Sequence, residues 1–295
     1  MGREAPAKET SMAEMSEEAR WPQNTKTLIA GLVAARFVLE VAGASHAVTQ
    51  FLSSTVALFL GAIYLGAVAP LRGVTRIRNL VLPSMVLTLW TVGWVVSAII
   101  VSAVLQFHGS HFPNPEDFSS WSQLRAHVTL HLAQIPVYAV LVFILMAVPF
   151  FVHRWPVTVG PVAVLGALVV IRYWVEGMGL DPTRASAWSS TVAVLLSGLY
   201  LGAMGPRLGL EGSMPFFIPA IVIAWAWRFW VFLAAVVGAT FPVYKTHFFD
   251  PSRGRAAVRL VELMGLGILE GFVFGVVIWI MAMCISRATR RTTAA

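Results

Sequence analysis

The chain has few charged residues, a single cysteine and none of the familiar catalytic motifs. Asp, Glu, Lys and Arg make up 12% of its 295 residues, and hydrophobic residues make up 58%, a balance outside the range of ordinary soluble domains. Because Cys284 is the only cysteine, an internal disulfide and a thiolate metal cage are excluded. The sequence also lacks a phosphate-binding loop, His-Glu-x-x-His, Gly-x-Ser-x-Gly and a dinucleotide fingerprint, which disfavours an enzyme built on one of them.

Long apolar runs hold most of the hydrophobic residues. A helix needs about 20 apolar residues to cross the hydrocarbon core of a bilayer. The sequence predicts eight such helices, at residues 22–44, 50–69, 80–106, 123–151, 156–178, 187–205, 215–243 and 257–285. We therefore expect an all-α, polytopic membrane protein whose first partner is the lipid bilayer.

An internal duplication organises the eight predicted helices. The stretch from Ser53 to Gly73 returns 136 residues later as Ser189 to Gly209, with 12 of 21 positions identical, where composition alone would give about one or two. Each copy holds four crossings, so both enter the membrane in the same sense, and a pseudo-two-fold axis along the membrane normal is expected. The predicted divisions are a disordered cytoplasmic tail (1–19), two four-helix repeats (20–153 and 154–286) and a basic cytoplasmic tail (287–295).

The basic residues indicate the orientation of the chain. The formal net charge is +7, but most Lys and Arg lie at the ends of predicted helices. The loops after the second, fourth and sixth helices, together with the two ends of the chain and Lys26 at the start of the first helix, hold 12 of the 21 basic residues. Because cytoplasmic loops carry the excess of Lys and Arg, we expect both termini in the cytoplasm and the chain in a plasma (inner) membrane. The charge therefore does not indicate a nucleic-acid partner.

Small residues recur at a spacing of four within three predicted helices. This spacing lets helix backbones approach closely. The positions are Ala62 and Gly66, Gly198 and Gly202, and Gly267, Gly271 and Gly275. We expect close helix contacts at these positions.

Both copies carry an arginine and a glutamate four residues apart, Arg36 with Glu40 and Arg172 with Glu176. At this spacing the two side chains share one helix face and can form an ion pair. Arg36 lies about 20 Å along its helix from the cytoplasmic start, at 1.5 Å per residue, which places the pair near the outer interface. Two interpretations are open: the pairs brace the outer helix ends, or they flank the mouth of a ligand or ion vestibule.

Arg228 is a charge near the predicted centre of the membrane. An unpaired arginine there costs at least ~2.5 kcal/mol, so a partner is expected. Glu270 falls at a similar depth, and we predict that it pairs with Arg228. The first copy has Val92 and Gln134 at these two positions, so both charges are absent together. Such a pair is either structural or part of a substrate or ion path.

A polar stripe runs along the fourth predicted helix. Its members are His127, His131, Gln134 and Tyr138, spaced 4, 3 and 4, which is one continuous helical face. Such a stripe should face the protein interior or water, not lipid. The imidazoles are candidates for a metal or haem, for a proton relay or for a quinone-type pocket. The alternative is simple hydrogen bonding to neighbouring helices.

Two outer loops repeat the pattern His-Phe-x-Asn/Asp-Pro. They begin at His111 and His247, and Asn or Asp before Pro favours a turn. We expect a structural role, with phenylalanine in the membrane interface. An extracytoplasmic metal site is the alternative, and its candidate ligands are His108, His111, Glu116, Asp117, His247, Asp250 and Glu262.

The sequence favours a transporter or channel with a polar path between the two halves. Duplicated halves recur among transporters, which is an analogy at the level of fold. Two alternatives stay open: a membrane subunit of a redox or enzyme complex with a quinone or haem pocket, and a membrane scaffold without a small-molecule ligand. The sequence identifies neither the solute or ion nor a cofactor, and no specific metal site is predicted.

Overall fold

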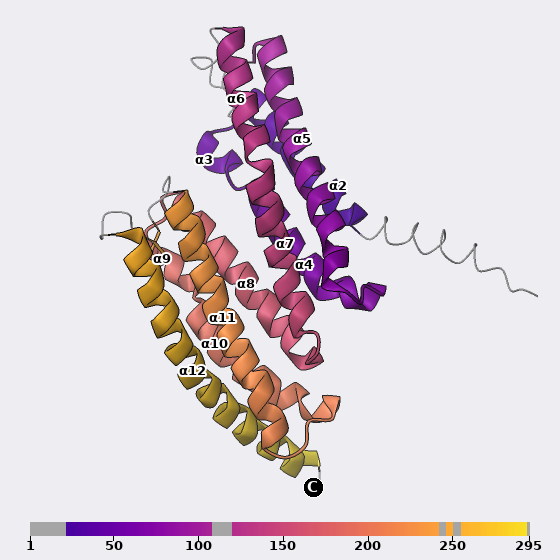
Figure 1. Ribbon diagram of the computed structural model, residues 1–295, viewed down its shortest axis with the longest axis vertical. Helices are drawn as coiled ribbons and strands as arrows, with labels where there is room; N and C mark the ends of the chain where they lie inside the picture. Colours follow the sequence, from indigo (N-terminus) through magenta and orange to yellow (C-terminus); the bar gives the residue numbers. More distant parts are fainter. Residues whose placement is uncertain (1–21, 108–119, 242–245, 250–254, 294–295) are drawn as a thin grey trace, which may run out of the picture. The chain divides into compact units, whose positions relative to one another are not determined.

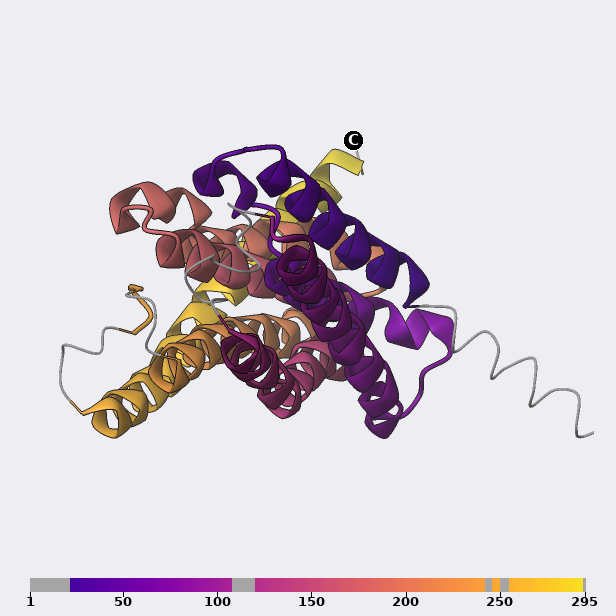
Figure 2. The ribbon, with the colours of Figure 1, turned by 90° about the horizontal axis from the view of Figure 1, so that it is seen from above.

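The computed structural model describes residues 22–107, 120–241, 246–249 and 255–293, and all regular secondary structure in these ranges is helical. The chain forms two compact units, Met1–Ala147 and Val148–Ala295. Figures 1 and 2 show the helices of each unit.

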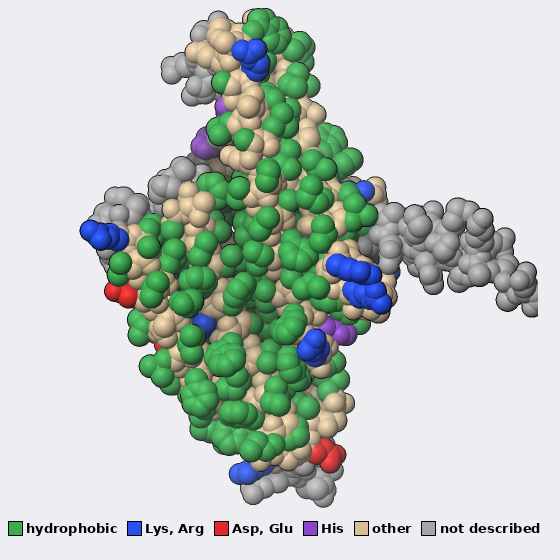
Figure 3. Space-filling model, viewed as in Figure 1, with side chains coloured by type: hydrophobic (Ala, Val, Ile, Leu, Met, Phe, Trp, Pro, Cys, Tyr) green, Lys and Arg blue, Asp and Glu red, His purple; other side chains and the backbone are tan. Residues whose placement is uncertain are grey.

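Seven helical stretches within the described ranges are long and apolar enough to cross a membrane. They are Ser54–Arg72, Ile77–Leu105, Trp121–Val152, Pro156–Gly177, Thr183–Met204, Met214–Thr240 and Ala256–Thr289. The helix α2 (Gln23–Val41) is not among them, because it holds Lys26, Arg36 and Glu40 within 19 residues. By length and composition, the described ranges therefore hold seven candidate crossings and not the predicted eight, and α2 is the predicted crossing that is not confirmed. Hydrophobic side chains cover most of the face shown in Figure 3, as contact with lipid hydrocarbon requires. The helices are those of a multi-pass integral membrane protein.

The first unit is built around α2. It packs against α4 (Ser54–Val68) and α5 (Val81–Leu105), and α5 in turn packs against α6 (Trp121–Ala133). The short α3 (His46–Thr49) leads into α4, and two short 3-10 turns, η1 (Ala69–Arg72) and η2 (Ile77–Leu80), lead into α5. Val33, Ile99 and Leu124 form one part of the apolar core.

The second unit is built around α11 (Met214–Thr240). It packs against α8 (Pro156–Gly177), α10 (Ser190–Met204) and the long α12 (Ala256–Thr293), and α10 lies against α8 and α12. Figure 1 shows α11 and α12 side by side along their length. The connections include α9 (Pro182–Ala185), η4 (Ser186–Trp188) and η5 (Pro206–Leu208). Trp230 is fully buried, and its Nε1–H donates to the carbonyl of Val162 at 3.0 Å.

The duplicated stretch adopts the same local structure in both units. A serine with extended backbone precedes the helix in each case, and the helix ends in a short 3-10 turn that contains proline. Gly73 (φ 82°) and Gly209 (φ 80°) close these turns. Glycine suits this left-handed conformation because other residues would place Cβ too close to the backbone.

The small residues allow helices to touch, as the spacing predicts. A Cβ on Gly66 would overlap the carbonyl of Met146, and a Cβ on Gly202 would lie 2.6 Å from the carbonyl oxygen of Ala282. In α12, a Cβ on Gly275 would lie 3.1 Å from Cα of Ile221. The neighbouring atoms are backbone, which cannot move aside as a flexible side chain would.

Two helix boundaries differ from the sequence-based expectation. The fourth predicted helix is interrupted at Gln134, between α6 and α7 (Ile135–Val152), because Pro136 has no N–H to continue the hydrogen-bond ladder. The last helix was expected to end near residue 285 and instead continues to Thr293. The basic residues beyond 286 therefore belong to a helix, since nothing in their sequence breaks it.

Replacement of Gly66 or Gly202 by valine should destabilise the protein. Overpacking against a facing backbone costs typically about 1–3 kcal/mol, so we expect a lower melting temperature for the detergent-solubilised protein. Gly93→Val is the matched control, because nothing lies within 4 Å of a Cβ at this position in α5. An equal loss in Gly93→Val would show that helix contact is not the cause.

Candidate functional site

A buried carboxylate organises the end of α8. Arg172 donates from Nε to Oε1 of Glu176 at 2.9 Å, and the Glu176 side chain is 1% exposed. His247 approaches the same carboxylate with both its backbone N–H and its ring Nδ1, each at 2.7 Å. One glutamate thus holds an arginine of its own helix and a loop residue 71 positions away.

The phenylalanines that follow His247 bury this loop segment in the unit. Phe248 and Phe249 are each 6% exposed. Phe248 lies against Tyr173, with ring centroids 6.2 Å apart, and Phe249 packs beside Gly238, where a Cβ would lie 2.9 Å from the Phe249 Cβ. These phenylalanines thus pack against α8 and α11, whereas Phe112 of the first motif lies outside the described residues. Their position in the membrane interface stays a prediction.

The corresponding pair in the first unit closes the end of α2. Arg36 donates from Nε to Oε1 of Glu40 at 2.9 Å, and the side chains are 10% and 2% exposed. Thr49 of α3 donates its hydroxyl to the same oxygen at 2.8 Å. Each glutamate therefore ties a helix end to the segment that packs on it. This geometry fits the bracing interpretation, and a role of Arg36, Glu40, Arg172 and Glu176 at an outer mouth stays a prediction.

Arg228 and Glu270 form the predicted ion pair. Arg228 Nη1 lies 2.7 Å from Glu270 Oε2, and the guanidinium also lies 5.2 Å from the ring of Trp227. Each of the two charged residues is 14 positions from the start of its helix, which is about 21 Å at 1.5 Å per residue. The Arg228 side chain is 14% exposed, whereas that of Glu270 is 45% exposed.

Gly267 makes room for the arginine of this pair. A Cβ at Gly267 would lie 3.4 Å from Nε of Arg228, and this Nε is buried without a hydrogen-bond partner. The first copy has His131 at the position of Gly267 and Val92 at that of Arg228. In each copy a larger residue at one of these two positions goes with a smaller residue at the other: Arg228 with Gly267, and His131 with Val92. The two positions therefore change together between the copies.

The polar stripe is divided by the break at Gln134. His127 and His131 lie on α6, where their rings meet edge to face with centroids 5.0 Å apart. Tyr138 lies on α7, and its ring meets Phe59 of α4 edge to face at 6.1 Å. All four members are half-buried, so the stripe lies partly within the first unit. Its role in a path or a cofactor pocket stays a prediction.

The described ranges contain no group of three or more His, Cys, Asp or Glu side chains that could hold a metal ion. Of the candidate ligands in the outer loops, only His247 and Glu262 lie in these ranges. His247 is engaged by Glu176, and Glu262 lies 3.8 Å from Arg259. His108, His111, Glu116, Asp117 and Asp250 lie outside the described residues.

Two contacts of the glutamates were missing from the sequence-based prediction. Thr49 and His247 are 9 and 71 positions from the glutamates that they contact, beyond the reach of helical spacing. The repeated His-Phe motif was the available signal for His247, because it recurs together with the Arg and Glu pair.

Comparison with known proteins does not assign the chain to a family. No family model, no curated protein and no solved structure matches it. Function is therefore inferred from the residues and their geometry.

Stability should fall on acidification because of His247. Burial lowers the pKa of His247 below its ordinary value of 6.5, against the opposing effect of the Glu176 carboxylate, while Arg172 acts with burial. Below pH 6.5 the unfolded chain then binds more protons than the folded chain, so stability is lost as the pH falls through the folded-state pKa. We expect the melting temperature to drop between about pH 7.5 and about pH 5.

His247→Asn should reduce this pH dependence, because it removes the imidazole and keeps the backbone N–H that donates a hydrogen bond to Glu176. Exposed His46 provides the matched control, His46→Asn. A slope as steep in His247→Asn as in the wild type would contradict the assignment.

The charges of Arg228 and Glu270 should depend on each other. Arg228→Val and Glu270→Gln each leave one unpaired charge, whereas the double variant has the neutral side chains of the first copy. We expect the two losses in unfolding free energy to be non-additive by roughly 1 kcal/mol or more, with the double variant more stable than their sum implies. Additive losses in a thermal or denaturant assay would show that the pair contributes nothing.

Proposed function

We propose that this chain is a membrane transporter or channel, with a polar path for a small solute or ion that passes Glu270. The proposal includes two four-helix repeats related by a pseudo-two-fold axis along the membrane normal, with α2 as an eighth crossing. It also includes cytoplasmic termini and a plasma (inner) membrane location. His127, His131, Gln134 and Tyr138 form the polar face that the first repeat contributes.

The exposure of Glu270 is the observation that carries this proposal. Its side chain is 45% exposed, although it lies about 21 Å from the start of α12 by helical rise. A charged group at that depth is costly against hydrocarbon, by about 2.5–3.5 kcal/mol on insertion scales. The exposed carboxylate is therefore accounted for by a water-filled path beside it, with Arg228 balancing its charge. Ionisable groups inside a membrane commonly mark such paths.

A charged thiol reagent tests for water at Glu270 without knowledge of the solute. In a Cys284→Ser background, Glu270→Cys is placed in proteoliposomes and treated with a membrane-impermeant sulfonatoethyl thiosulfonate. We expect labelling about tenfold faster than at Leu269→Cys, because a charged reagent does not enter hydrocarbon. Leu269 is the adjacent residue and is 62% exposed, so it serves as the control at the same depth.

If Glu270→Cys reacts only with a lipid-soluble maleimide, as Leu269→Cys is expected to do, the carboxylate faces lipid and no aqueous path reaches it. A scaffold role would then be favoured.

The second candidate is a membrane subunit of a redox complex. It is favoured by His127 and His131, whose rings lie 5.0 Å apart on one half-buried face. Imidazole is a common ligand of haem iron. The visible absorption spectrum of the purified protein tests whether haem is bound, because bound haem has a strong absorption band in the violet region.

A further inference from the structure

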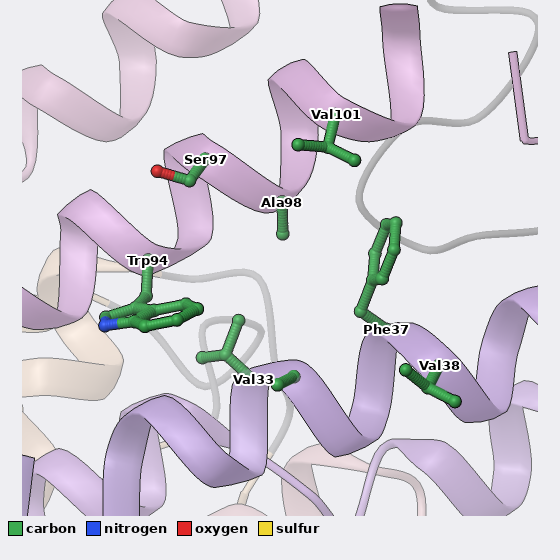
Figure 4. Close-up of a pocket in the computed structure, with 8 residues that line it drawn as sticks. Val33, Phe37, Val38, Trp94, Ser97, Ala98 and Val101 are labelled. Atoms are coloured by element: carbon green, nitrogen blue, oxygen red, sulfur yellow. The ribbon is translucent and has the colours of Figure 1, made fainter. Parts of the chain in front are cut away.

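An apolar groove lies between α2 and α5 in the first unit. It encloses about 170 Å³. Figure 4 shows the side chains that line it. They are Val33, Ala34, Phe37 and Val38 from α2, and Trp94, Ser97, Ala98 and Val101 from α5. Val38 is 62% exposed and Val101 is 42% exposed, so the groove is open along one side. We propose that it holds an acyl chain of an anionic phospholipid whose headgroup is bound by Lys26.

The groove is continuous with a cationic end of the two helices. Lys26 Nζ lies 5.5 Å from the ring of Trp90, and the Trp90 Nε1–H donates to the carbonyl of Lys26 at 2.9 Å. The next turn of α5 carries Trp94, which meets Trp90 edge to face at 6.1 Å and lines the groove. Lysine and tryptophan side by side are typical of the headgroup level of a bilayer.

The groove extends along α2 away from Lys26. At 1.5 Å per residue, the Cα of Val33 is about 10 Å from that of Lys26 and the Cα of Val38 is about 18 Å from it. An acyl chain whose headgroup lies at Lys26 therefore runs along the groove as far as Val38.

Charge selects the class of lipid. Lys26 is the cation at the end of the groove where α5 presents Trp90. Anionic lipids are attracted by such juxtamembrane cations, at about 1 kcal/mol for each Lys or Arg. An anionic headgroup therefore complements this end of the groove better than a zwitterionic one.

The second copy has larger side chains at three of the groove positions. Val170, Trp174 and Leu233 stand where the first copy has Ala34, Val38 and Ser97. Trp230, which corresponds to Trp94, is 2% exposed, whereas Trp94 is 37% exposed. The groove is therefore a feature of the first copy and not a general consequence of the duplicated helices.

Native mass spectrometry of the full chain tests the proposal. The protein is released from detergent after exposure to equal amounts of phosphatidylglycerol and phosphatidylcholine of the same chain length. We expect wild type to retain about five times more phosphatidylglycerol than phosphatidylcholine, because one cation contributes about 1 kcal/mol to binding of an anionic lipid. Lys26→Gln should remove this preference and leave retention of both lipids.

Two further variants separate the groove from the rest of the surface. The double variant Ala34→Val/Ser97→Leu has the bulk of the second copy and should lose the retained lipid, with an unchanged melting temperature showing that it folds. Val104→Leu is the control on α5, because Val104 is 61% exposed and does not line the groove. Equal lipid retention in the filled variant and in wild type, or equal retention of the two lipids by wild type, would overturn the proposal.

Discussion

The hydrocarbon of a bilayer offers no hydrogen-bond partner, and this constraint shapes the whole chain. Backbone groups must be satisfied within the protein, which is why every described span is a helix. The same constraint applies to charge. Glu176 is 1% exposed and accepts from an arginine, a backbone N–H and a histidine ring, while Glu40 accepts from an arginine and a threonine. These glutamates each join a helix to the segment that packs on it.

The two copies share a scaffold and differ in polar content. Both have small residues four positions apart in α4 and in α10, the terminal glycine turn and the Arg and Glu pair. Only the second has the Arg228 and Glu270 pair, with Gly267 leaving space beside the guanidinium. Only the first has the two neighbouring histidines of α6. Duplication thus accounts for the packing, and the residues in which the copies diverge are the ones that our functional proposals use.

Much of this architecture is readable from sequence because helical spacing and hydropathy are local. The Arg228 and Glu270 pair was predicted by counting depth along two helices, and its 2.7 Å contact confirms it. Contacts that depend on loop paths were not predicted, as Thr49 and His247 show. The break at Gln134 follows from Pro136, a signal that was present but outweighed by the continuous apolar run. The α2–α5 groove depends on side-chain sizes across two helices, which no single-helix pattern reports.

The Arg228 and Glu270 pair is predicted to lie within the hydrocarbon region. Its depth is measurable by electron paramagnetic resonance of a nitroxide on Leu269→Cys in a Cys284→Ser background, from the relative broadening by oxygen and by a water-soluble nickel chelate. We expect strong collision with oxygen and little with nickel, at a depth of about 15 Å from either surface. Collision with nickel as strong as that of a label in water would contradict it, because the pair would then lie outside the membrane.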